Sequence, residues 1–167
     1  MTIYPGAPKS YDMIEEAGEV IREAKSCGLA SVVWSYPRDG DISKDGETAV
    51  DIVGYAAHIA ALIGAHIIKV KLPTDTVEQT SATKLYAERV TTGTLADRVQ
   101  HVVQCAFAGR RIVVFSGGGR KGEQGIYEEA KAIRAGGGHG SIRGRNSFQR
   151  EFLEGKKMLE TVIDIYK

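Results

Sequence analysis

The sequence predicts an α/β fold, the C-terminal half of a (β/α)₈ barrel. Short apolar segments alternate with amphipathic helical segments, and the strands are apolar on both faces, which is typical of a parallel sheet covered by helices. Four complete strand–helix units follow a residual strand end, whereas a closed barrel needs eight units and typically ~250 residues. The alternative is an open doubly wound sheet of four or five strands. No Rossmann glycine fingerprint follows the first strand, which counts against a nucleotide site there.

The N-terminal elements follow from local signals. Residues 2–6 combine β-branched and aromatic residues with a Pro-Gly turn and predict the tail of a strand. Ser10 is expected to cap a helix over 11–26, where apolar residues recur at helical spacing. The apolar run 29–35, stopped by Pro37, predicts a buried strand.

The middle of the chain carries the longest irregular segment. A polar loop over 38–47 precedes a predicted helix over 48–63, and 66–72 predicts a strand that contains two lysines. The polar stretch 74–94, with a short helix near 82–88, is long enough to indicate a functional insert.

The remaining segments continue the alternation and complete a single partial barrel domain over residues 1–167. We expect a helix over 95–108, a strand over 111–115, a helix over 123–135, a strand over 140–143 and one or two closing helices over 147–167.

Composition limits the classes of partner. The chain has 167 residues, 43% of them hydrophobic, which allows one domain with a real core. With 22 basic and 21 acidic residues, nothing favours binding to nucleic acid or to a membrane. Cys27 and Cys105 lie far apart in helical patterns, and no leader or long apolar run occurs, so we expect a cytoplasmic chain without disulfides. The histidines lack metal-ligand spacing, so neither a metal nor another cofactor is expected.

Two lysines in an apolar strand are the most unusual feature. Lys69 and Lys71 share one strand face, and burial disfavours the charged form of an amine. A neutral lysine is a nucleophile for a ketone. Trp34 and Tyr36 share a face of the preceding strand, where Tyr36 can relay protons and Trp34 can wall the pocket. The alternatives are a solvated Lys71 at the strand end and an aromatic pair that only packs the core.

Glycines follow two later strands. Ser116, Gly117 and Gly118 end one strand, and Gly144 and Arg145 follow the next. Glycine backbone N–H groups can approach an anion closely, and a guanidinium suits phosphate. Glycine turns end many strands, but two at successive strand ends indicate a phosphate cradle. Together with the lysines they suggest Schiff-base chemistry on a phosphorylated carbonyl compound.

These segments resemble, in order and approximate spacing, the archaeal-type class I fructose-bisphosphate aldolases. The resemblance rests on the runs 32–38, 67–71, 115–118 and 144–146, covers nearly the whole chain, and extends to 2–6, which is similar to the end of the family's fourth barrel strand. The long insert is similar to the bacterial branch of the family.

The resemblance implies roles for individual residues. Lys69 is expected to form the Schiff base and Tyr36 to act as acid and base. The expected substrate-binding residues are Trp34, Arg38, Lys71, Ser116, Gly117, Gly118, Gly144 and Arg145. The expected reaction is the metal-independent, reversible cleavage of fructose 1,6-bisphosphate to dihydroxyacetone phosphate and glyceraldehyde 3-phosphate.

The chain departs from the family in length. The family's first four strands, including a catalytic aspartate and a neighbouring histidine on the first, have no counterpart here, so the sequence resembles a truncated or split product. Alternatives are therefore a half-barrel subunit that needs an N-terminal partner or associates with itself, or a relative acting on another phosphorylated ketose or diketone. An open half-barrel exposes sheet edges, and we expect a homo-oligomer or association with the missing half.

Overall fold

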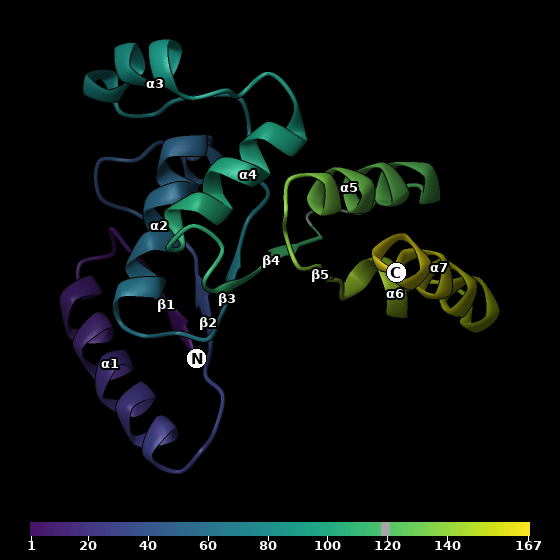
Figure 1. Cartoon of the computed structure of the whole chain (residues 1–167), viewed down its shortest axis with the longest axis horizontal. Helices are drawn as coiled ribbons and strands as arrows, with labels where there is room; N and C mark the ends of the chain where they lie inside the picture. The colour runs from purple at the N-terminus through teal and green to yellow at the C-terminus, as the bar shows by residue number, and fades with distance from the viewer. Residues whose placement is uncertain (118–120) are drawn as a thin grey trace.

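The computed structural model describes residues 1–117 and 121–167 and places one five-stranded sheet at the centre of the chain (Figure 1). The strands are β1 (Thr2–Ile3), β2 (Val32–Ser35), β3 (Ile67–Val70), β4 (Ile112–Ser116) and β5 (Ser141–Ile142). The α-helices are α1 (Ser10–Ser26), α2 (Val50–Leu62), α3 (Thr83–Arg89), α4 (Leu95–Cys105), α5 (Glu123–Ala135), α6 (Arg145–Phe148) and α7 (Phe152–Tyr166). Short 3₁₀ turns span Gly46–Thr48 and Thr80–Ala82.

The sheet is parallel and its strands follow one another in chain order. The spatial order is β1-β2-β3-β4-β5, and each neighbouring pair is parallel. In Figure 1 α1 lies at the left and α5, α6 and α7 lie at the right, while α3 lies at the top, above α2. A doubly wound sheet reverses its strand order at a switch point. The doubly wound alternative is therefore wrong, because this order winds in one direction as in a barrel.

Burial differs between the two faces of the sheet. Val33, Ile68 and Val113 are fully buried and belong to one core cluster with the alanines of α2 and the valines of α4. The neighbouring residues on the opposite face, such as Trp34 and Lys69, are half-buried. Helices therefore cover one face, and the other face remains partly open among the described residues.

A second, smaller core joins the last two long helices. Ile126 and Ala130 on α5 pack against Met158 and Val162 on α7. This contact fastens the C-terminal helix to the strand–helix unit that contains β4 and α5.

The predicted elements are all present, and their ends differ by a few residues. Helix α5 has the predicted bounds, whereas β2 and β3 are shorter than the apolar runs around them. The prediction that Ser10 caps α1 was wrong. Ser10 is the first residue of the helix, Lys9 is the N-cap, and no side-chain cap hydrogen bond is present there.

The predicted insert folds back on the domain. Asp51 on α2 accepts hydrogen bonds from the backbone N–H groups of Glu78 and Gln79 at 3.1 and 2.9 Å. The hydroxyl of Tyr86 on α3 lies 2.9 Å from Nε2 of His101 on α4. These bonds hold the insert at the top of Figure 1, beyond α2 and α4. Within the described residues, no helix has the length and apolar character needed to span a membrane.

Candidate active site

A cavity of about 760 Å³ opens at the carboxyl ends of β2, β3 and β4. This is the position of active sites in parallel α/β barrels, since successive βα loops meet there. Six of the predicted site residues line the cavity: Tyr36, Lys71, Ser116, Gly117, Gly144 and Arg145. Lys69 and Trp34 are not among the lining residues, because each lies two residues earlier on its strand. Arg38 reaches the site through an ion pair, and Gly118 lies outside the described residues.

Lys69 and Trp34 are partners on adjacent strands. They are paired in the register of β2 and β3, and the Lys69 Nζ lies 5.2 Å from the centroid of the Trp34 ring. Both side chains belong to the sheet face that the helices leave open. Burial lowers the pKa of the Lys69 amine, because loss of hydration disfavours the ammonium form. This raises the fraction of neutral, nucleophilic amine at a given pH.

The side chain of Tyr36 extends from the end of β2 across the carboxyl end of β3. Its backbone N–H donates to the carbonyl of Ile3 at 3.1 Å, which places the residue directly beyond the end of β2. Burial raises the pKa of its phenol, while a hydrogen bond with Ser116 and the charge of Arg38 act in the opposite direction. Ser116 ends β4, so the Tyr36–Ser116 contact crosses above the lysine-bearing strand between them. The Tyr36 phenol is thus held over that strand.

The Glu47 carboxylate forms ion pairs with three cationic side chains at one end of the cavity. Its carboxylate accepts from Arg38 at 2.7 Å, Lys44 at 2.9 Å and Lys71 at 2.5 Å, and its side chain is 8% exposed. Burial alone would raise the pKa of Glu47, but the hydrogen bonds from Lys71, Lys44 and Arg38 outweigh it and lower the pKa to about 2. Glu47 therefore stays ionised and holds Lys71 and Arg38 together. One carboxylate leaves this group of cations with net positive charge.

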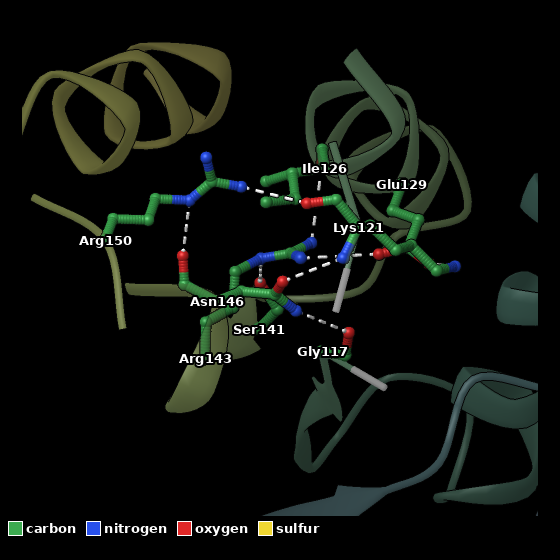
Figure 2. A network of polar contacts seen from close by, with 8 residues as sticks. All are labelled: Gly117, Lys121, Ile126, Glu129, Ser141, Arg143, Asn146 and Arg150. Carbon is green, nitrogen blue, oxygen red and sulfur yellow. Dashed lines mark hydrogen bonds and ion pairs between the residues drawn. The ribbon is translucent and has the colours of Figure 1, made fainter. Parts of the chain in front are cut away.

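Asn146 joins the two glycine-containing loops at the other end of the cavity (Figure 2). Its Nδ2 donates to the carbonyl of Gly117 at 3.4 Å, and its Oδ1 accepts from the backbone N–H of Lys121 at 3.0 Å. Gly117 packs closely against Arg143, because a Cβ there would lie 3.1 Å from Cγ of Arg143. The loop after β4 and the turn after β5 are thus fixed relative to each other.

A buried ion pair lies beneath these loops. Arg143 donates to Glu129 at 3.3 Å, to Ser141 Oγ at 2.9 Å and to the carbonyl of Ile126 at 3.4 Å. Glu129 also pairs with the ammonium of Lys121, and Figure 2 shows all these contacts converging between α5 and the end of β5. The guanidinium is fully enclosed by named acceptors, so it supports the fold and does not face the cavity.

Sequence reasoning missed several of these residues. Glu47, Glu129 and Asn146 contact the predicted site residues or their loops. Glu47 and Glu129 stand in no local motif, whereas Asn146 ends the run 144–146 but was given no role. Lys121 follows the glycine run after one intervening residue, Arg120, and this position is a signal that could have identified it.

The histidines make structural contacts. Nδ1 of His58 lies 2.9 Å from the carbonyl of Cys105, and Nδ1 of His66 accepts from the Ser31 N–H at 3.0 Å. Nδ1 of His139 accepts from the Val113 N–H at 3.3 Å. Among residues 1–117 and 121–167, no three His, Cys, Asp or Glu side chains are grouped to hold a metal ion.

Comparison with known proteins gives consistent matches. The model of the DeoC/LacD family aldolases matches residues 1–150. A probable class 1 fructose-bisphosphate aldolase of Chlamydia muridarum is 32% identical over 99% of this chain and 50% of its own length. A class 1 fructose-bisphosphate aldolase of Thermoproteus tenax is 34% identical over 89% of this chain and 48% of its own length.

Solved structures match over the whole fold. An archaeal fructose-1,6-bisphosphate aldolase, with its catalytic lysine covalently bound to the carbinolamine intermediate of the substrate, superposes with a TM-score of 0.77 at 30% identity. The match covers 99% of this chain and 56% of that one. The chain therefore spans about half the length of these relatives, which confirms the predicted half of a (β/α)₈ barrel. By its sequence and its fold, the chain belongs to the DeoC/LacD aldolase family.

Proposed function

We propose that the chain carries the Schiff-base and phosphate-binding half of a class I fructose-bisphosphate aldolase. The observation that carries this proposal is the Lys69 amine, whose pKa is lowered by burial and which lies 5.2 Å from the Trp34 ring on the open face of the sheet. The names of the relatives support the choice of reaction. The candidate substrate is fructose 1,6-bisphosphate in its open-chain form.

In the proposed reaction the neutral amine of Lys69 attacks the C2 ketone. Loss of water from the carbinolamine gives an iminium, which is an electron sink. A base removes the proton of the C4 hydroxyl, the C3–C4 bond breaks, and its electron pair enters the iminium to give an enamine. Glyceraldehyde 3-phosphate leaves. Protonation of the enamine at C3 and hydrolysis release dihydroxyacetone phosphate and restore the lysine.

Tyr36 is the proposed proton-transfer group of this half. Burial raises the pKa of its phenol and so favours the protonated form, and the phenol can pass a proton through Ser116 or directly to the substrate. Trp34 forms the wall beside Lys69. Its ring limits water near the amine and so favours the neutral form.

The two ends of the cavity suit two phosphate groups. Backbone N–H groups near Gly117 and Gly144, with the Arg145 guanidinium, form the proposed cradle for one of them. Gly118 belongs to this proposal by sequence alone. Lys71 and Arg38, held by Glu47, are the proposed cationic site for the other. A bisphosphate of intermediate length would bridge the two ends and place its ketone over β3.

The proposed protein acts in the cytoplasm, needs no metal or other cofactor, and forms one partial barrel domain over residues 1–167. The open face of the sheet carries partly exposed apolar residues, including Val32, Ile67 and Val114. Ile112, at the start of β4, is 42% exposed. Such a surface favours association, and the proposed partner is the N-terminal half of the barrel or a second copy of this chain. The alternative function is a subunit that is inactive without that partner.

Borohydride trapping tests the proposal. The folded chain is incubated with dihydroxyacetone phosphate and sodium borohydride, and the modified lysine is located by peptide mass mapping. We expect a stable adduct on Lys69, and none in the Lys69→Ala variant. Lys84→Ala is the control, because this exposed lysine on α3 does not line the cavity and its removal should leave the adduct in place.

The other outcomes are informative. An adduct on Lys71 would keep the reaction class and move the nucleophile by two residues. No adduct in a chain that circular dichroism shows to be folded would contradict activity of this half alone. The same trapping repeated with the separate N-terminal half of a relative would then decide whether the chain is a subunit.

A further inference from the structure

Lys121 is a cation at the phosphate end of the cavity that has no assigned role. It lies two residues before α5 and lines the cavity with Gly117 and Gly144. Its side chain is 45% exposed. Its backbone N–H donates to Asn146 Oδ1 at 3.0 Å, so the start of the side chain is held in place while its end can move.

The ammonium of Lys121 shares its partner with a buried cation. Glu129 pairs with both Lys121 and Arg143, and the Arg143 side chain is only 2% exposed (Figure 2). A buried charge that loses its partner is strongly destabilising. Glu129 must therefore stay with Arg143, and of its two cations only Lys121 is free to change partner.

Charge balance supports the same conclusion. The single negative charge of Glu129 is taken up by Arg143, so the positive charge of Lys121 has no full counterpart in this ion pair. A lysine ammonium has three N–H donors. It can keep one hydrogen bond to Glu129 and direct another to an anion in the cavity.

We infer that Lys121 is a further phosphate-binding residue, paired with Glu129 in the empty site and in contact with the phosphate in the occupied one. The inference rests on the proposed function, because the phosphate is that of the proposed substrate. It adds a mobile cation to a cradle otherwise built from backbone N–H groups and Arg145. Charge-assisted hydrogen bonds of this kind contribute about a ten-fold change in affinity.

Calorimetric titration with inorganic phosphate tests the inference directly. We expect Lys121→Ala to weaken phosphate binding about ten-fold. The matched control is Lys131→Ala, which removes an exposed lysine on α5 that does not line the cavity. It should leave the affinity unchanged. Circular dichroism confirms that both variants fold, which the exposure of both side chains favours.

A second measurement separates this inference from the proposed function. Dihydroxyacetone lacks a phosphate, so its borohydride trapping reports on Lys69 alone. Lys121→Ala should leave this trapping unchanged and raise the half-saturating concentration of dihydroxyacetone phosphate about ten-fold. Unchanged phosphate affinity in Lys121→Ala, or no phosphate binding by the unaltered chain, would overturn the inference whether or not Lys69 is trapped. Failure of trapping with intact, Lys121-dependent phosphate binding would overturn only the proposed reaction.

Discussion

Replacing Glu47 with glutamine removes the carboxylate shared by Arg38, Lys44 and Lys71 while nearly preserving side-chain volume. The pKa of Glu47 falls from its ordinary value of 4.5 to about 2 in the folded chain. A difference of this size corresponds to about 3 kcal/mol of stabilisation at neutral pH. This value is an upper value, because the Glu47 side chain is 8% exposed but those of Arg38 and Lys44 are 37% and 79% exposed, so solvent screens part of the interaction.

The sign of the pH dependence follows from the lowered pKa. A carboxyl group that is more acidic in the folded state stabilises it above the unfolded pKa and loses this effect as the pH falls through the folded pKa. For Glu47 the window runs from 4.5 down to about 2. About 2 kcal/mol of the free energy of unfolding is therefore lost between pH 7 and pH 3 through this residue.

Urea unfolding followed by far-ultraviolet circular dichroism measures the effect. In the Glu47→Gln variant, the loss of stability between pH 7 and pH 3 should be about 2 kcal/mol smaller than in the unmodified chain. Asp45→Asn, two residues away and exposed, is the control and should keep the original pH dependence. The same loss in Glu47→Gln and the unmodified chain would refute the assignment of a strongly lowered pKa to Glu47.

Three further predictions concern the lysine, the buried ion pair and one packed glycine. The pH at which borohydride trapping at Lys69 reaches half its maximal rate should lie below 10.5, because burial lowers the pKa of this amine; a midpoint at or above 10.5 would contradict it. Glu129→Ala should destabilise the chain by about 3–5 kcal/mol in urea unfolding, since it leaves Arg143 buried without its partner. The double variant Glu129→Leu/Arg143→Met should recover most of this loss, and no recovery would mean that the charge is not the cause. Gly138→Ala should lower the thermal unfolding midpoint by several degrees, because its Cβ would lie 2.9 Å from the Phe115 ring; an unchanged midpoint would show that the site can relax.

The helices and strands were predictable because the spacing of apolar residues along the sequence reflects which side chains are buried. Alternation along β3 placed Lys69 on the face opposite Ile68, and the structure buries Ile68 fully while leaving Lys69 partly exposed. The helical spacing over α5 predicted both of its ends. Element order then predicted a parallel sheet without any knowledge of contacts.

Fine detail at the helix ends was less predictable. The Ser10 N–H donates to the carbonyl of Ala7 at 2.9 Å, and the Met13 N–H donates to Lys9 at 3.1 Å. The turn before α1 therefore starts the helix one residue early, and the serine side chain is not needed as a cap. A cap signal in the sequence cannot account for a preceding turn that already supplies these bonds.

The ion pairs of the candidate site depend on contacts between distant positions. Glu47 and Lys71 are 24 residues apart, and Glu129 and Arg143 are 14 apart. Patterns along a helix or strand reach only three or four positions, so they carry no information on such pairs. Only the fold determines which carboxylate meets which cation.

The position of each strand in the sheet has a consequence for partial unfolding. β3 is hydrogen-bonded to a neighbour on both sides, whereas β5 contains two residues and pairs only with β4 in the described residues. Backbone groups of a doubly paired central strand open last, and short edge elements fray first. Under mild denaturant or gentle warming, the proposed phosphate cradle at β5 should therefore open while the strand that carries Lys69 is still intact. The proposed phosphate binding and the proposed reaction at Lys69 would then be lost at different denaturant concentrations or temperatures.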